Sequence, residues 1–222
     1  NGNIWIGYFK NGLDIISPSM EITHYSSFEL GLREESIYAF CEDHTGIIWI
    51  SDGGGVYRAQ KGTMRFERVT EFGNGYIQDI MEDSQGNIWI AAMGNGLYKY
   101  NIHSRKSKQY LADGKPGSIS SNSVSSILED SKGRIWVSTD RGGICCFQNG
   151  AFQAYSLAEG LPDDIVYRAV EDAHGNIWFG TNHGLVRLEP DTKGVQVFDK
   201  KDGLSVSRFN YNSVAMTDKG TT

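Results

Sequence analysis

The 222-residue sequence has little proline, little cysteine and no excess of positive charge. Only 4 prolines accompany 27 glycines, a glycine share well above the usual roughly 7%, so the excess indicates many tight turns rather than a disordered linker. The 3 cysteines cannot form a disulfide framework, and free cysteine is usually a small buried hydrophobe. The formal net charge is −6, and binding a phosphate backbone requires a cationic surface. We therefore expect no nucleic-acid partner for this segment.

Long apolar runs are also missing. No stretch approaches the roughly 20 residues that a membrane-spanning helix needs. The chain has no signal peptide and begins with Asn1 rather than methionine, so we expect a segment of a longer protein. With 39% hydrophobic and 12% aromatic residues, the composition is sufficient for a sizeable core and excludes a disordered chain.

All 5 tryptophans lie in one recurring motif. It reads Gly-x-Ile-Trp followed by Ile, Val or Phe, and its tryptophans are Trp5, Trp49, Trp89, Trp136 and Trp178. Four copies are preceded by a Glu-Asp pair, whose aspartates are Asp43, Asp83, Asp130 and Asp172. A step from glycine to an apolar residue follows each motif. The repeat recurs at intervals of roughly 40 to 47 residues and covers essentially the whole chain.

Each period is predicted to contain four short strands. In one period, residues 76–82 alternate, residues 88–92 are apolar, and further strands are expected over 97–100 and 108–110. Short strands with glycine-rich turns and a period near 40 are typical of propeller blades. We therefore predict an all-β fold, a β-propeller built of about five four-stranded blades. The full blades are expected over about residues 28–70, 71–112, 113–157 and 158–204.

The two ends of the chain are predicted to supply a partial blade. Residues 1–27 would give its second, third and fourth strands, and residues 205–222 its first strand, over 211–216. Two arrangements stay open at this point. The N- and C-terminal strands could close a five-bladed ring, or the chain could be a fragment of a larger propeller.

The recurring aspartates and tryptophans have a structural interpretation. An Asp at the start of an Asp-x-x-Gly turn accepts backbone N–H groups, and the Gly takes the position with positive φ. The Trp that follows would pack between neighbouring blades. A catalytic pair of carboxylates is a single arrangement, whereas these residues recur in every full unit, so we predict no catalytic residue among them.

The combined motif resembles the two-component regulator propeller repeat. The resemblance rests on Glu-Asp-x-x-Gly-x-Ile-Trp, on the Gly-Leu-Tyr or Gly-Leu-Val step, and on the turns at Gly160-Leu161 and Gly203-Leu204. It implies a periplasmic sensor region of an inner-membrane hybrid histidine kinase and response regulator of Bacteroidetes. The implied ligand is an oligosaccharide or polysaccharide fragment, and the implied output is control of carbohydrate-utilisation genes through a kinase outside this segment. It further implies no enzyme activity in the segment, no cofactor, a homodimer formed by the parent receptor, and membrane contact only through other parts of that chain.

Departures from the repeat on one face of the propeller are the candidate ligand contacts. Loops joining fourth to first strands and second to third strands share this face. Flat aromatic rings suit the apolar surface of sugars, and amides, carboxylates and arginines suit hydroxyl groups and acidic sugars. The candidates are Tyr38, Tyr76, Asn95, Arg141, Tyr167, Arg168, His183, Arg208 and Tyr211. The same side chains could instead fill a rim or form a protein interface, where Tyr and Arg are also favoured.

Two alternative functions remain open. The motif also resembles the streptogramin lyase type of propeller, which uses histidine with a divalent metal. Of the 5 histidines, His183 alone lies in a second-to-third-strand loop, and no cluster has metal-ligand spacing, so we predict no metal site. The third hypothesis is a purely structural propeller that mediates dimerisation.

Overall fold

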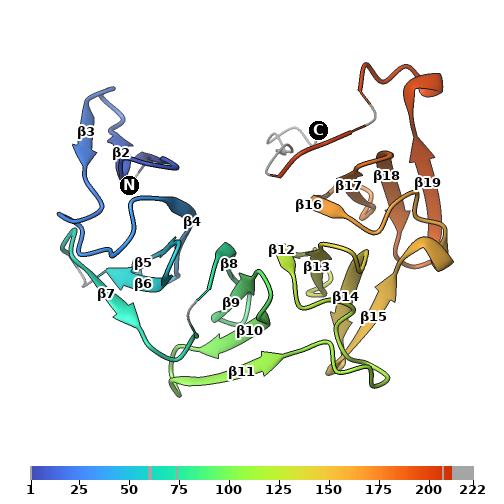
Figure 1. Ribbon diagram of the computed structural model, residues 1–222, viewed down its shortest axis with the longest axis horizontal. Coiled ribbons are helices and arrows are strands. Elements are labelled where there is room, and N and C mark those ends of the chain that lie inside the picture. The colour runs from blue at the N-terminus through green and yellow to red at the C-terminus, as the bar shows by residue number, and fades with distance from the viewer. Residues whose placement is uncertain (1, 60–61, 74, 207, 212–222) are drawn as a thin grey trace. The chain divides into compact units, whose positions relative to one another are not determined.

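The computed structural model describes residues 2–59, 62–73, 75–206 and 208–211. These residues form short β-strands and two 3-10 turns, η1 (Leu157–Glu159) and η2 (Lys200–Asp202) (Figure 1). The chain divides into two compact units: an N-terminal unit of residues 1–92 and 98–108, and a C-terminal unit of residues 93–97 and 109–222. In the described part of the chain, no helix has the length and apolar character required to cross a membrane.

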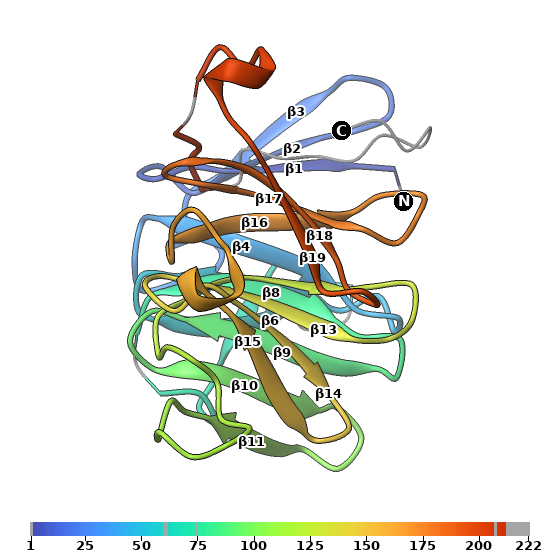
Figure 2. The same cartoon turned by 90° about the vertical axis from the view of Figure 1, so that its right-hand side faces the viewer.

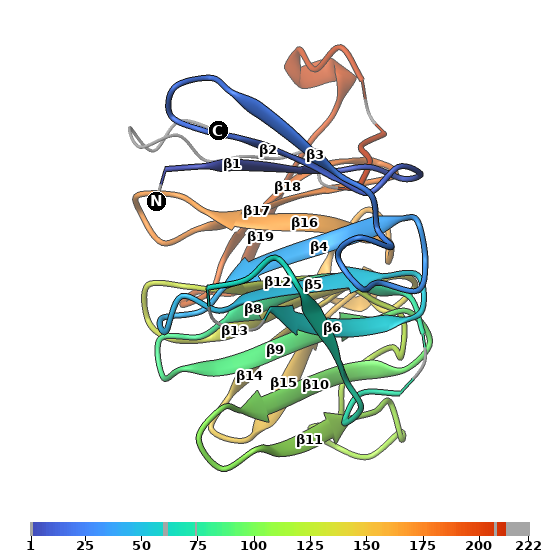
Figure 3. The same ribbon diagram turned by 90° about the vertical axis from the view of Figure 1, so that its left-hand side faces the viewer.

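The N-terminal unit begins with a three-stranded sheet, seen beside β4 in Figure 3. Its strands are β1 (Ile4–Gly7), β2 (Leu13–Ile16) and β3 (Ile22–Tyr25). A four-stranded sheet follows, made of β4 (Ile37–Glu42), β5 (Ile48–Asp52), β6 (Gly55–Ala59) and β7 (Phe66–Val69). The next consists of β8 (Ile77–Glu82), β9 (Asn87–Ala92), β10 (Gly96–Asn101) and β11 (Lys106–Tyr110). The first strands of neighbouring sheets contact one another, β1 with β4 and β4 with β8.

The C-terminal unit contains two further four-stranded sheets (Figure 2). One consists of β12 (Val124–Glu129), β13 (Ile135–Thr139), β14 (Ile144–Gln148) and β15 (Ala151–Tyr155). The other consists of β16 (Val166–Glu171), β17 (Ile177–Thr181), β18 (Gly184–Glu189) and β19 (Gly194–Phe198). In both, strands follow one another in chain order, and β12 contacts β16. These meandering sheets are the blades of a β-propeller, which confirms the predicted fold class.

The strand predicted over residues 211–216 falls largely outside the described residues. Only Tyr211 of that range is described, and it lies in a turn rather than a strand.

The first strand of each four-stranded sheet contains a β-bulge, which the sequence did not predict. The register shifts occur between Ile37 and Ala39 in β4 and between Ile77 and Asp79 in β8. Equivalent shifts lie near the starts of β12 and β16. Simple alternation over residues 76–82 is therefore broken, because a bulge inserts an extra residue and changes the direction of the side chains. In consequence, Asp79 and the adjacent Ile80 are both buried.

The Asp-x-x-Gly turns are held by one carboxylate each. Asp43 accepts hydrogen bonds from the backbone N–H groups of Thr45 at 2.9 Å and Ile47 at 3.0 Å. Its second oxygen accepts the indole N–H of Trp49 at 2.9 Å, a bond that the motif alone did not predict. The same bond recurs three times: Trp89 to Asp83 at 2.7 Å, Trp136 to Asp130 at 2.7 Å, and Trp178 to Asp172 at 2.8 Å. The spacing of six residues between Asp and Trp therefore ties the turn to the core.

These hydrogen bonds favour the charged carboxylate. Burial opposes ionisation of Asp172, but hydrogen bonds from Trp178 and Asn176 lower its pKa to about 2. The pKa of Asp43 is also lowered, since hydrogen bonds from Thr45 and Trp49 outweigh its burial. Asp43 and Asp172 are thus structural anions that support their blades.

Candidate functional site

Three aromatic side chains meet in the N-terminal unit, and we call Phe9, Tyr38 and Tyr76 the aromatic cluster. The ring centroids of Phe9 and Tyr38 are 6.4 Å apart at 88°, and those of Tyr38 and Tyr76 are 6.1 Å apart at 85°. Edge-to-face contacts of this kind are favourable and fix ring orientation. Phe9 is 69% exposed and Tyr76 is 57% exposed, so the cluster presents ring surface to solvent.

Three separate connections bring these rings together. Phe9 lies between β1 and β2, Tyr38 is the second residue of β4, and Tyr76 stands just before β8. Gly53, in the β5–β6 turn, lies against them: a Cβ there would be 3.6 Å from the Tyr76 ring and 3.8 Å from the Tyr38 ring. A Cβ at this position would make only ordinary van der Waals contacts, so the turn lies directly beside both rings.

Asp52 fixes the polar loops beside the aromatic cluster. Its fully buried carboxylate accepts hydrogen bonds from the backbone N–H groups of Arg33 and Glu34, both at 3.1 Å. The other oxygen accepts the N–H of Gly54 at 2.8 Å. The Glu34 side chain lies over this turn, 3.5 Å from the position of a Cβ at Gly54. A carboxylate and exposed aromatic rings thus share one edge of the unit.

Three of the predicted residues meet Asn182 in the C-terminal unit, and we call Tyr167, Asn182, Arg208 and Tyr211 the polar cluster. The Tyr167 hydroxyl donates to Asn182 Oδ1 at 2.7 Å, and Arg208 Nε donates to the same oxygen at 3.2 Å. The Tyr167 and Tyr211 rings are 5.1 Å apart at 83°. Burial, followed by the charge of Asp140, raises the pKa of Tyr211, which stays protonated and able to donate a hydrogen bond.

Backbone contacts place Arg208 in this cluster. The Phe209 N–H donates to the Thr181 carbonyl at 3.2 Å. The Phe209 ring packs on Gly180, where a Cβ would lie only 2.6 Å from the ring. A larger residue at Gly180 would displace the segment that carries Arg208, so the glycine in β17 positions the guanidinium.

The remaining candidates lie apart from the Asn182 network. His183 Nδ1 lies 2.5 Å from Asp163 Oδ2, with the His183 side chain 70% exposed. Arg141 is 84% exposed, with its Nε 4.0 Å from Asp140 Oδ1. Asn95 lies in the β9–β10 turn, where its carbonyl accepts from Gln109 at 2.9 Å. Arg168 is half-buried in β16.

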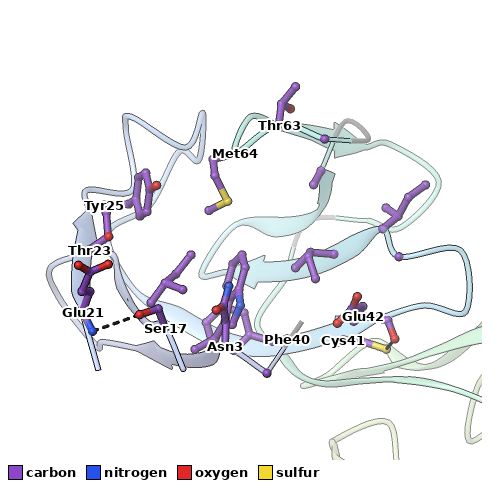
Figure 4. A pocket seen from close by; sticks show the side chains of 18 residues that line it. Asn3, Ser17, Glu21, Thr23, Tyr25, Phe40, Cys41, Glu42, Thr63 and Met64 are labelled. Atoms are coloured by element: carbon purple, nitrogen blue, oxygen red, sulfur yellow. Dashed lines mark hydrogen bonds between the residues drawn. The ribbon is translucent and has the colours of Figure 1, made fainter. Parts of the chain in front are cut away.

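Sequence reasoning missed Phe9 and a cavity. Phe9 follows Tyr8 in the second-to-third-strand loop of the partial first repeat, and scanning that loop for aromatic residues would have found it. The cavity, about 700 Å³ in volume, lies in the N-terminal unit between the β1–β3 sheet and the β4–β7 sheet (Figure 4). No motif could have indicated a space that arises from two facing sheets. Among the described residues, no group of three His, Cys, Asp or Glu could hold a metal ion.

Fold and repeat together define a β-propeller protein, and the comparisons identify the particular family. The sequence profile of the two-component regulator propeller matches residues 31–54, 71–94, 118–141 and 160–183. Each matched segment holds the first two strands of a blade with the loop before them. The chain therefore carries four two-component regulator propeller repeats.

One curated relative and several solved structures are similar to this chain. Histidine kinase P4 of Formosa agariphila is 26% identical over 95% of this chain, which spans only 16% of that protein's length. The extracellular domain of BT3049 from B. thetaiotaomicron, assigned as a hybrid two-component system, is 24% identical with a TM-score of 0.84. The match covers 99% of this chain and 30% of that one. A catalytically inactive virginiamycin B lyase from Staphylococcus aureus is 18% identical, with a TM-score of 0.70, over 89% of this chain and 66% of the lyase. The two structural likenesses establish the fold.

Proposed function

We propose that this chain is the ligand-recognition segment of a membrane-bound two-component sensor, and that its ligand is an oligosaccharide in the periplasm. The family of the repeats and the kinase relative support the sensor assignment. The kinase that reports binding, and that controls carbohydrate-utilisation genes, lies outside this segment. Binding would act by shifting the equilibrium between two receptor arrangements, which requires different affinity for each.

The exposed aromatic cluster is the observation that carries this proposal. Two of its rings are more than half exposed, although such area is normally buried in a soluble domain. Their mutual contacts hold them in fixed orientations, so little conformational entropy is lost when a flat sugar face packs on them. Glu34 beside the rings supplies an acceptor for sugar hydroxyl groups.

The polar cluster supports a second contact for the same class of ligand. Arg208 donates its Nε–H to Asn182 Oδ1. A guanidinium can bond a carboxylate or sulfate through two parallel N–H groups. This cluster therefore favours an acidic sugar unit, while the aromatic cluster favours an uncharged one.

The test is a titration with a panel of defined neutral and acidic oligosaccharides, followed by native mass spectrometry and calorimetry. For a sugar that binds, Tyr76→Ala should weaken affinity by roughly tenfold or more, which corresponds to about 1.4 kcal/mol. Phe28→Ala is the matched control, because Phe28 is 66% exposed in the same unit but lies outside the aromatic cluster. Equal affinities of the two variants would contradict the assignment of the aromatic cluster. Arg208→Ala should weaken acidic ligands selectively.

A lyase-like enzyme is the second candidate, and the His183–Asp163 contact is the observation that favours it. A carboxylate that orients an imidazole is a common arrangement for a general base. A ligand whose own mass changes during the titration, with the change lost in His183→Ala, would replace the sensor proposal by this one. A silent panel with a clear dimer peak would instead favour a structural dimerisation propeller.

A further inference from the structure

In two repeats, the glutamate of the Glu-Asp pair contacts the turn of the preceding blade. Glu82, at the end of β8, accepts the backbone N–H of His44 at 2.7 Å, and its other oxygen lies 2.5 Å from His44 Nδ1. Glu171, at the end of β16, accepts the backbone N–H and the hydroxyl of Ser131, both at 2.7 Å. In each unit, one carboxylate therefore joins two neighbouring blades through a backbone hydrogen bond and a side-chain contact.

His44 and Ser131 occupy the same place in the repeat, directly after the aspartate of the Asp-x-x-Gly turn. The hydroxyl of Ser131 bonds its carboxylate in the same way at any ordinary pH. An imidazole instead changes its charge near neutral pH, and a charged donor bonds a carboxylate roughly twice as strongly as a neutral one. The contact of His44 with Glu82 therefore depends on protonation, whereas that of Ser131 with Glu171 does not.

A second histidine faces this contact from the β10–β11 turn of the blade that carries Glu82. The ring centroids of His44 and His103 are 6.1 Å apart, and the rings are inclined at 55°. The His44 side chain is 50% exposed and His103 is also exposed, so solvent protons reach both rings. Two imidazolium charges at this separation repel one another. The contact therefore accommodates one positive charge better than two.

The C-terminal unit has an acid at the position of His103. The β10–β11 and β18–β19 turns both follow the third strand of a blade, and His103 and Asp191 are their second residues. The last residues of the two turns, Arg105 and Lys193, both have a positive φ, so the turns match in conformation. Asp191 accepts a hydrogen bond from Lys132 Nζ at 2.6 Å, from the turn of the preceding blade. Opposite charges thus meet at this seam, whereas two histidines meet at the other.

The other titratable groups around His44 favour its charged form or carry no charge. The hydrogen bond and the charge of Glu82 raise the pKa of His44, burial opposes them, and the charge of Asp43 adds to them. Burial raises the pKa of the Cys41 thiol beside Glu82 to about 11, so this thiol is neutral at physiological pH. Among the described side chains of this contact, His103 is therefore the group whose protonation opposes a charge on His44.

We propose that His44, Glu82 and His103 form a pH-dependent clamp between the β4–β7 blade and the β8–β11 blade. The clamp is tightest when His44 is charged and His103 is neutral. It loosens at higher pH, where His44 loses its charge, and at lower pH, where His103 gains one. The clamp lies at the ends of β4 and β8 opposite to Tyr38 and Tyr76, and the proposal does not depend on the oligosaccharide.

An NMR titration of the imidazole groups in the full 222-residue chain tests the coupling between the two rings. His44 should titrate above the roughly 6.5 of an unperturbed histidine. His103→Asp should raise its midpoint by a further about 0.5 pH unit or more, because an attractive charge replaces a repulsive one. The fold should tolerate this change, since Asp191 holds the same position in the other unit.

His174→Gln is the matched control, because His174 lies in an Asp-x-x-Gly turn of the C-terminal unit and takes no part in the clamp. It should leave the titration of His44 unchanged. A His44 midpoint at or below about 6.5, or one that His103→Asp does not move, would overturn the proposal.

Urea unfolding of His44→Ser tests whether the clamp stabilises the protein. This variant rebuilds the contact that Ser131 makes with Glu171, without a ring that titrates. A group whose pKa is raised in the folded state stabilises it below its unfolded pKa, and this contribution is lost as the pH rises through the folded pKa. The urea midpoint of the unmodified protein should therefore fall, relative to that of His44→Ser, between about pH 6 and pH 9. A difference between the two midpoints that stays constant over this range would refute the clamp.

Discussion

Replacing Asp130 by alanine should destabilise the protein strongly. Asp130 is 4% exposed, and its Oδ2 accepts hydrogen bonds from Trp136 Nε1 at 2.7 Å and Arg134 Nε at 2.5 Å. Its Oδ1 accepts the backbone N–H groups of Lys132 at 3.0 Å and Arg134 at 2.9 Å. The variant would leave a buried indole donor unsatisfied and remove the main partner of a buried guanidinium.

The expected loss follows from these two groups. A buried donor without an acceptor costs about 1–3 kcal/mol, and a buried ion pair broken on one side costs about 3–5 kcal/mol. Asp191 still holds Arg134 at 3.3 Å, which reduces the second contribution. We therefore expect about 4 kcal/mol in total. For a chain of this length, each 1 kcal/mol lowers the melting temperature by about 2–4 °C, so the fall should be about 8–16 °C.

Chemical denaturation and differential scanning calorimetry measure this loss. Asp113→Ala is the control, because Asp113 forms an exposed ion pair with Lys115, with side chains 44% and 79% exposed. Such a pair contributes about 0–1 kcal/mol. A double variant with Trp136→Phe should lose less than the sum of the single variants, since the indole donor is then absent. A loss below about 1 kcal/mol for Asp130→Ala, or full additivity, would refute the role assigned to the carboxylate.

Two further predictions concern a turn and the response to acid. Gly143→Ala should destabilise by about 3 kcal/mol or more in denaturant unfolding, since its Cβ would lie 1.9 Å from the Tyr155 carbonyl oxygen. At Gly150 an added Cβ would meet open space, so Gly150→Ala introduces only the strain of a positive φ and should cost about 1–2 kcal/mol. Equal losses of stability in the two variants would contradict the steric argument. Because the folded pKa of Asp172 is lowered to about 2, its stabilisation is present above pH 4 and is lost as the pH falls from 4 to 2. Because Asp172 is partly exposed, this stabilisation amounts to about 1 kcal/mol. In urea unfolding, the free energy of unfolding of Asp172→Asn should therefore fall less between pH 4 and pH 2 than that of the unmodified protein.

The repeat was predictable because local chemistry determines it. Asp43 and Gly46 define a turn within four residues, and an aspartate that accepts nearby N–H groups works the same way in each copy. The bulge between Ile77 and Asp79 was not predictable, because it depends on how two strands pair. The indole bond to the aspartate likewise requires the turn and the next strand to be in place.

The candidate sites were predictable only in part, because they also depend on which loops the fold brings together. Tyr38 and Tyr76 were selected as departures from the repeat at the starts of first strands, and the structure brings their rings to 6.1 Å. Phe9 completes that cluster from a loop of the partial repeat, whose phase relative to the others is harder to assign. The Tyr167 hydroxyl donates to Asn182 and the residue is 8% exposed, so its ring supports the polar cluster instead of presenting a surface.

The repeat also explains why its recurring residues are structural. A tryptophan, a carboxylate and a cation form one network in the repeat of Trp136, and its members bond one another. Because the carboxylate already accepts hydrogen bonds from its own blade, contacts to a ligand are expected from residues that depart from the repeat, such as Tyr38 and Tyr76.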